Sequence, residues 1–131
     1  MARLFLTALA LAVALVFPAR SASLSKEYTY FMIGGRTMAE IEKELVRHGP
    51  KLASTGKRHA GATRMEFSTR LDYGERNGRC AVISAKVSVK ATVILPRWRE
   101  RGVDADVRLV WEALSADIKR HEESHIAIAR N

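Results

Sequence analysis

Residues 81–95 read AVISAKVSVKATVIL and place an apolar side chain at every odd-numbered position. The even-numbered positions from 84 to 92 carry Ser, Lys, Ser, Lys and Thr. A period of two over this length is typical of a β-strand with one buried and one solvated face. We expect Pro96 to end the strand.

The segment before this strand alternates in the same way from residue 64 to residue 73, and Gly74 to Gly78 is interpreted as the turn between the two. The two segments therefore predict an antiparallel hairpin. Its lysine-bearing face is interpreted as solvated surface, with a polyanion site as the alternative. The apolar face of the first strand carries Met65, Phe67, Leu71 and Tyr73.

Shorter elements flank the hairpin. Aromatic and β-branched residues from Glu27 to Ile33, followed by two glycines, predict a strand and a turn. Thr37 and Glu40 have the spacing of a capping box, and the apolar spacing that follows predicts a helix over 38–48. A last helix, capped by Asp104 or Asp106, follows from the spacing of Val107, Val110, Trp111, Leu114 and Ile118. The order β-α-β-β-α predicts an α+β fold, with an antiparallel hairpin packed against two helices.

The first 21 residues have the pattern of a signal peptide. Arg3 gives a basic start, and residues 4–17 are apolar except for Thr7. This run is shorter than the roughly 20 apolar residues of a spanning helix, so a membrane anchor is the weaker alternative. Ala19 and Ser21 fit the rule for small residues before the cleavage site, which predicts cleavage after Ser21. The mature protein is expected to be secreted or periplasmic, without stable membrane insertion.

The chain is basic, with a formal net charge of +8 over 131 residues. Removal of Arg3 and Arg20 with the signal peptide would leave +6. Because an exported protein has little access to nucleic acid, we predict no nucleic-acid partner and interpret the charge as an aid to solubility or an attraction to anionic envelope polymers. Cys80 is the one cysteine and is expected to be buried.

Residues 121–125 of the last helix read HEESH, which matches H-E-x-x-H. Residues four apart lie one above the other on a helix, so His121 and His125 can bind one Zn²⁺. Glu122 can then act as the general base toward the water that the metal activates. The sequence thus predicts a zinc-dependent peptidase with His121 and His125 as metal ligands and Glu122 as the catalytic residue.

The helical phase predicts where these side chains point. At about 100° per residue, His121 and His125 fall in the sector of the apolar residues, and Glu122 falls at its margin. The alternative is a pair of packed histidines beside solvated carboxylates. Asp117 lies four residues before His121 and could orient its ring, or could form a surface ion pair instead.

The mature sequence also resembles a bacterial family of domains of unknown function described as secreted zinc-dependent proteases. The resemblance covers nearly the whole mature chain and implies export and zinc peptidase activity. Met65 departs from it, since a tryptophan is expected there, and this looks like a packing change. The resemblance rests on Tyr28-Thr29-Tyr30, Gly35-Arg36-Thr37, Glu40, His48-Gly49-Pro50, Gly61, Thr63, Cys80-Ala81-Val82, Leu95-Pro96-Arg97-Trp98, Trp111 and the HExxH pair.

The third protein ligand is not evident. None of the residues from Ile126 to Asn131 is His, Asp, Glu or Cys, so a third ligand would come from upstream, from a partner or from a continuation beyond Asn131. His59 is the preferred upstream candidate, and His48 is interpreted as the last-turn cation of its helix. Residues 22–131 are taken as a single zincin-like α+β domain, with truncation at the C-terminus left open.

Two other functions remain open. The missing third ligand motivates a non-catalytic zinc-binding envelope protein. The basic charge and the face that carries Lys86 and Lys90 motivate a basic envelope-associated module without metal. The substrate and the oligomeric state do not follow from the sequence.

Overall fold

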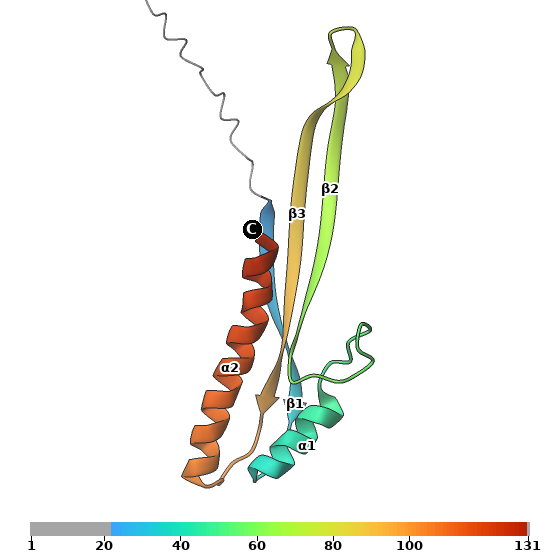
Figure 1. Ribbon diagram of the computed structural model, residues 1–131. Helices are drawn as coiled ribbons and strands as arrows, with labels where there is room; N and C mark the ends of the chain where they lie inside the picture. Colours follow the sequence, from blue (N-terminus) through green and yellow to red (C-terminus); the bar gives the residue numbers. More distant parts are fainter. Residues whose placement is uncertain (1–21, 131) are drawn as a thin grey trace, which may run out of the picture.

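The computed structural model describes residues 22–130 (Figure 1). The predicted signal peptide, residues 1–21, and Asn131 lie outside the described part of the chain. Five elements follow in the predicted order: β1 (Ser23–Ile33), α1 (Met38–His48), β2 (Ala62–Arg76), β3 (Arg79–Trp98) and α2 (Ala105–Arg130). The predicted α+β fold is confirmed. Within residues 22–130, neither helix combines the length and the apolar composition needed to cross a bilayer.

The three strands form one mixed sheet in the order β1-β3-β2. β2 and β3 pair antiparallel as the predicted hairpin, with Ala62 opposite Ile94 and Arg76 opposite Arg79. β1 pairs with the other edge of β3 in the parallel sense, from Ser23 opposite Ser88 to Ile33 opposite Trp98. The long β3 strand is therefore the centre of the sheet, and its alternation determines which face is buried.

The hairpin turn is tighter than predicted. The strands continue to Arg76 and from Arg79, and the turn is Asn77-Gly78, whose φ values of 56° and 73° suit a two-residue turn. A register shift at Asp72/Tyr73 makes Val82, and not Ile83, the partner of Tyr73. Gly74, predicted to begin the turn, lies within β2, where a Cβ would come 2.8 Å from Cδ1 of Ile83.

Pro96 does not end β3, which continues to Trp98. The prediction was wrong because β2 flanks β3 only as far as Ile94, where it pairs with Ala62. Beyond that point one edge of β3 is free, and a proline is tolerated at such an edge.

Helix α1 matches its predicted bounds. The Thr37 side chain accepts a hydrogen bond from the Glu40 amide at 3.3 Å, as a capping box requires. The Glu40 carboxylate accepts from the Arg36 amide at 2.7 Å, one residue earlier than in the usual box. Gly49 follows His48 as the C-cap.

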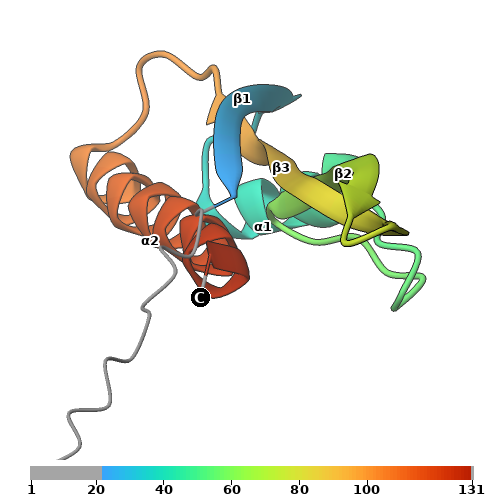
Figure 2. The same cartoon turned by 90° about the horizontal axis from the view of Figure 1, so that it is seen from above.

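Helix α2 covers one face of the sheet, which we call the inner face (Figure 2). Ala91, Val93 and Leu95 of β3 pack there against Ile118 and Ile126 of α2. A second buried cluster joins α1 to the start of α2. It contains Ile33, Ile41, Leu45 and Trp111.

Beyond Ser23, where β1 begins, β2 and β3 continue as a two-stranded arm (Figure 1). We define the arm as residues 69–76 and 79–87. Cys80 lies near its tip and is exposed, so the prediction of a buried thiol was wrong. Neither helix reaches this part of the hairpin (Figure 1), so no helical layer covers Cys80.

Candidate metal centre

The HEESH segment lies near the end of α2. Its last residue, His125, precedes the last residue of the helix, Arg130, by five positions. Its glutamate, not its histidines, takes the buried position: Glu122 is 6% exposed, whereas both histidines are exposed. The expected placement of His121 and His125 inside the apolar sector was therefore wrong. The buried residues of α2 are Trp111, Ile118, Glu122 and Ile126.

The difference is a rotation of the helix about its axis. The residues of the predicted sector are buried or half-buried as expected: Val107, Trp111, Leu114 and Ile118. The contact with the sheet runs along Ile118, Glu122 and Ile126, which are spaced four residues apart. The histidines consequently flank the contact line and face a cavity beside it.

This cavity brings the predicted site residues together. It has a volume of about 460 Å³ and lies between the loop before β2, the first residues of β2 and the motif helix. His59 lines it together with both motif histidines and Glu122, so the preferred third-ligand candidate does lie at the site. The other lining residues are Leu52, Ser54, Gly61, Ala62, Thr63 and Met65.

The two motif histidines have a separation that suits a shared metal. Their ring centroids are 5.0 Å apart with an interplanar angle of 89°. Two imidazoles that bind one tetrahedral zinc through nitrogen at about 2.1 Å place their ring centroids about 5 Å apart. The separation of the two rings therefore matches that of two ligands of one zinc, and it is also the ordinary spacing of a T-shaped pair of rings.

His59 does not complete a ligand set as it stands. Its Nε2 lies 3.1 Å from the Thr55 hydroxyl, which occupies that nitrogen. Among the side chains of residues 22–130, no group of three or more His, Cys, Asp or Glu is close enough to hold a metal. A three-protein-ligand site would need the His59 ring to leave Thr55.

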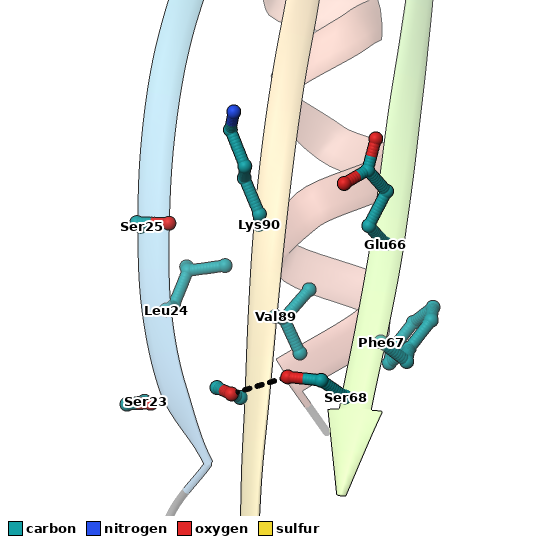
Figure 3. Close-up of a pocket in the computed structure, with 9 residues that line it drawn as sticks. Ser23, Leu24, Ser25, Glu66, Phe67, Ser68, Val89 and Lys90 are labelled. Atoms are coloured by element: carbon teal, nitrogen blue, oxygen red, sulfur yellow. Dashed lines mark hydrogen bonds between the residues drawn. The ribbon is translucent and has the colours of Figure 1, made fainter.

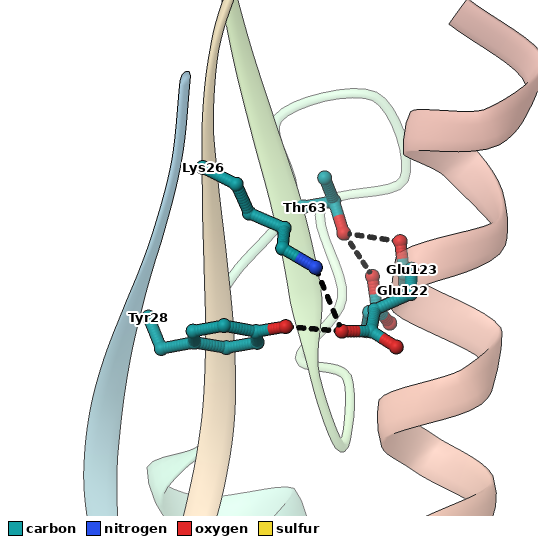
Figure 4. Close-up of polar contacts among 5 residues, drawn as sticks. All are labelled: Lys26, Tyr28, Thr63, Glu122 and Glu123. Carbon is teal, nitrogen blue, oxygen red and sulfur yellow. Dashed lines mark hydrogen bonds and ion pairs between the residues drawn. The ribbon is translucent and has the colours of Figure 1, made fainter. Parts of the chain in front are cut away.

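Glu122 is held in place from two sides. The Thr63 hydroxyl lies 2.9 Å from both Oε2 and the carbonyl oxygen of Glu122, and it can donate its one proton to either (Figure 4). Gly61 passes so close that a Cβ there would lie 2.9 Å from Cγ2 of Ile118 and 3.1 Å from Cγ of Glu122. The start of β2 thus forms a cradle for this carboxylate and leaves it lining the cavity.

Glu123 has a structural role that the sequence did not predict. It accepts hydrogen bonds from the Tyr28 hydroxyl and, at 3.2 Å, from Lys26 Nζ, both on β1 (Figure 4). The Tyr28 hydroxyl, followed by Lys26, lowers the pKa of the Glu123 carboxyl from its ordinary value of 4.5. These contacts tie the motif turn of α2 to β1. The Tyr28-Thr29-Tyr30 run was noted in the sequence, but its partner could be found only in three dimensions.

The remaining polar candidates lie outside this arrangement. Asp117 pairs with Arg120, Oδ1 to Nη2 at 2.7 Å, which is the surface alternative and not an orienting bond to His121. His48 lies in the last turn of α1, with Nδ1 3.3 Å from Oε2 of Glu44.

The chain is similar to a known bacterial family over most of its length. Residues 28–131 match the bacterial family described as proteins of unknown function, DUF922. No curated protein and no solved structure matches the chain. The matched range includes every residue of the candidate metal centre.

Proposed function

We propose that this chain, which belongs to the bacterial DUF922 family, is an exported zinc-dependent peptidase. The observation that carries the proposal is the cavity of about 460 Å³ that His59, His121, Glu122 and His125 line. Three imidazoles and a carboxylate around one hollow are the donor set of a catalytic zinc site. Export rests on the signal peptide predicted in residues 1–21.

Each residue then has a defined task. His121 and His125 would hold the ion, and His59 would complete the set after exchanging its bond to Thr55. A bound zinc ion would supply the Lewis acid that polarises the scissile carbonyl and acidifies water. Glu122 accepts the proton from the attacking water and delivers it to the leaving amine.

The surroundings of Glu122 support its role as the base. A carboxylate that is 6% exposed cannot swing freely, and the Thr63 hydroxyl leaves only part of its acceptor capacity free. The other oxygen, Oε1, would lie 3.2 Å from a Cβ at position 61, and the Glu122 side chain lines the cavity. The carboxylate is therefore pre-oriented with one oxygen available for proton transfer.

Peptide hydrolysis tests this proposal. We expect the zinc-loaded protein to cleave casein or a mixed peptide library, and the activity to disappear on addition of a chelator. Glu122→Gln should retain zinc and lose hydrolysis, because the amide cannot accept the proton. The control is Glu112→Gln, which removes the charge of an exposed acid on the same helix, away from the motif. Equal cleavage by the wild type and Glu122→Gln would contradict the assignment.

A second candidate is a zinc-binding envelope protein without catalysis. It is favoured by the Thr55 contact of His59, which leaves only two imidazoles ready to bind. In that case zinc binds, yet no preparation cleaves peptides and Glu122→Gln changes nothing measurable. The alternative of a basic module without metal has less support, because Lys90 is paired with Glu27 at 3.2 Å.

A further inference from the structure

The inner face of the hairpin remains apolar where the helices no longer cover it. Five large side chains on this face are 43–63% exposed. Monomeric proteins seldom expose a contiguous apolar patch of this kind without using it. We call these residues the apolar strip: Phe67, Leu71 and Tyr73 of β2, and Val82 and Val87 of β3.

The strip has one charged neighbour on the same face, Glu75, which pairs with Cys80 beyond Tyr73 and Val82 at the tip end of the strip. Two smaller residues lie between the large ones on the inner face. Thr69 is opposite Val87, and Ala85 is opposite Leu71. The other charges between Phe67 and Tyr73 lie on the opposite face, as with Arg70, which pairs with Lys86 across the strands. A polyanion is therefore a poor match for the strip, whereas an uncharged apolar segment fits it.

The strip is continuous with the candidate metal centre. Met65 precedes Phe67 on the inner face of β2 and lines the cavity together with His121 and His125. At the root of the arm, the apolar residues Leu24, Val89 and Phe67 are register partners across three strands. They line a further hollow of about 500 Å³ together with polar residues of the opposite face, including Glu66 and Lys90 (Figure 3). On the inner face, an apolar path thus leads from Met65 at the site to Tyr73 and Val82 in the arm.

The dimensions of the strip favour an extended peptide over a second copy of the chain. At about 3.3 Å per residue, the eight steps from Met65 to Tyr73 span about 26 Å, the length of an extended peptide of eight residues. The five side chains expose on the order of 500 Å², if large apolar side chains present about 150–200 Å² in full. A stable protein–protein interface needs about 800 Å² from each partner.

We infer that the apolar strip docks an extended polypeptide segment with apolar side chains and leads it to the candidate metal centre. This inference rests on the proposed peptidase function and names its substrate class. Docking would raise the local concentration of such a substrate beside His121 and His125 without any change in the chemistry at the site.

Direct binding tests the strip independently of catalysis. The probe is a fluorescein-labelled decapeptide that alternates leucine with serine, compared with the same peptide carrying glutamate in place of leucine. Binding is measured by anisotropy on Glu122→Gln in the presence of chelator, so that neither metal nor cleavage contributes. We expect the leucine peptide to bind at least about tenfold more tightly than the glutamate peptide.

Matched variants locate the binding surface. Phe67→Ser with Tyr73→Ser should weaken binding at least about tenfold, as truncation of aromatic anchors does. Val46→Ser with Leu109→Ser changes two apolar residues that are 70% and 68% exposed on the helices, and it should leave binding unchanged. Circular dichroism verifies that both double variants fold.

The outcomes separate this inference from the proposed function. Strip-dependent binding without any zinc or cleavage would support the strip and overturn the peptidase. Zinc-dependent cleavage with equal peptide binding by both double variants would overturn the strip alone. A wild-type dimer in sedimentation velocity, lost in Phe67→Ser/Tyr73→Ser and accompanied by no peptide binding, would also overturn it, because the occupant would then be a second copy.

Discussion

At the scale of single residues, the buried Glu122 is the most demanding feature of the molecule. A carboxylate that is 6% exposed needs hydrogen-bond partners, and Thr63 supplies one at 2.9 Å from Oε2. Gly61 leaves the space for its side chain. Gly61, just before β2, and Thr63, within it, therefore determine whether the base can occupy its position.

Replacement of Thr63 by valine should destabilise the fold. The variant keeps the shape but removes the donor, which leaves a buried carboxylate oxygen with fewer partners at a cost of about 1–3 kcal/mol. Urea unfolding measures the change. Thr69→Val is the control, because Thr69 is exposed on the same strand and should change the unfolding free energy by less than about 0.5 kcal/mol. Equal effects of the two substitutions would contradict the role of Thr63.

Replacement of Gly61 by alanine should also destabilise the fold, for a steric reason. The new Cβ would lie 2.9 Å from Cγ2 of Ile118 and 3.1 Å from Cγ of Glu122, so α2 would have to move away at a cost of about 1–3 kcal/mol. A thermal melt detects the loss. Gly34→Ala is the matched control, since its Cβ would meet only the Oε1 end of the flexible Glu100 side chain. If Gly61→Ala kept the melting temperature of the wild type, the close packing of Gly61 against Ile118 and Glu122 would not be needed for stability.

At the scale of elements, the parallel pairing of β1 with β3 positions the motif helix. β1 contributes Tyr28 and Lys26 to hold Glu123, and on the opposite face it is fastened to β3 through Glu27. Glu27 accepts a hydrogen bond from the Thr92 hydroxyl at 2.9 Å and pairs with Lys90 at 3.2 Å. These contacts lower the pKa of the Glu27 carboxyl from its ordinary value of 4.5, and the Thr92 bond has the larger effect.

The lowered pKa of Glu27 predicts a loss of stability in acid. A carboxyl whose pKa is depressed in the folded state contributes stability above its unfolded value of 4.5, and this contribution is lost as the pH falls through the lower folded value. We therefore expect Glu27→Gln to reduce the unfolding free energy near pH 7 and to differ much less from the wild type near pH 3. Urea titrations at both values measure this. Glu66→Gln is the control. If both variants showed the same pH dependence of the unfolding free energy, the stabilising role assigned to the Glu27 carboxylate would be contradicted.

The sequence predicted those elements whose signals are local. The capping pair Thr37 and Glu40 and the stop at Gly49 gave the bounds of α1, and the alternation from Ala81 to Leu95 gave the hairpin. The parallel β1–β3 pairing joins residues that are far apart in the chain, so no local pattern carried it. The register shift at Asp72/Tyr73 likewise exchanged Ile83 for Val82 opposite Tyr73.

The candidate site was predictable in its residues but not in its orientation. The HExxH spacing identified His121, Glu122 and His125, and His59 followed from a search for a further ligand. The rotation of α2 did not follow, because the apolar residues Trp111 and Ile118 do not reveal that the contact with the sheet continues along Glu122, a charged residue, to Ile126. The bond from His59 to Thr55 depends on the fold of the loop, which has no periodic signal.

At the scale of the whole molecule, a compact end and an extended arm have separate tasks in the proposal. The compact end contains both buried clusters and the histidine-lined cavity, and the arm presents the apolar strip. The candidate base is buried at the compact end, while the two motif histidines remain accessible beside it. The central claim is therefore that His121 and His125, assisted by His59, hold one zinc ion.

Bound zinc per chain, determined by elemental analysis after dialysis against trace zinc, tests this claim most directly. The account predicts about one zinc per chain in the wild type and in the His48→Ala control, weaker retention in His59→Ala, and less than about a tenth of the wild-type content in His121→Ala/His125→Ala. Equal zinc contents in the wild type and in the double variant, whether high or negligible, would contradict it.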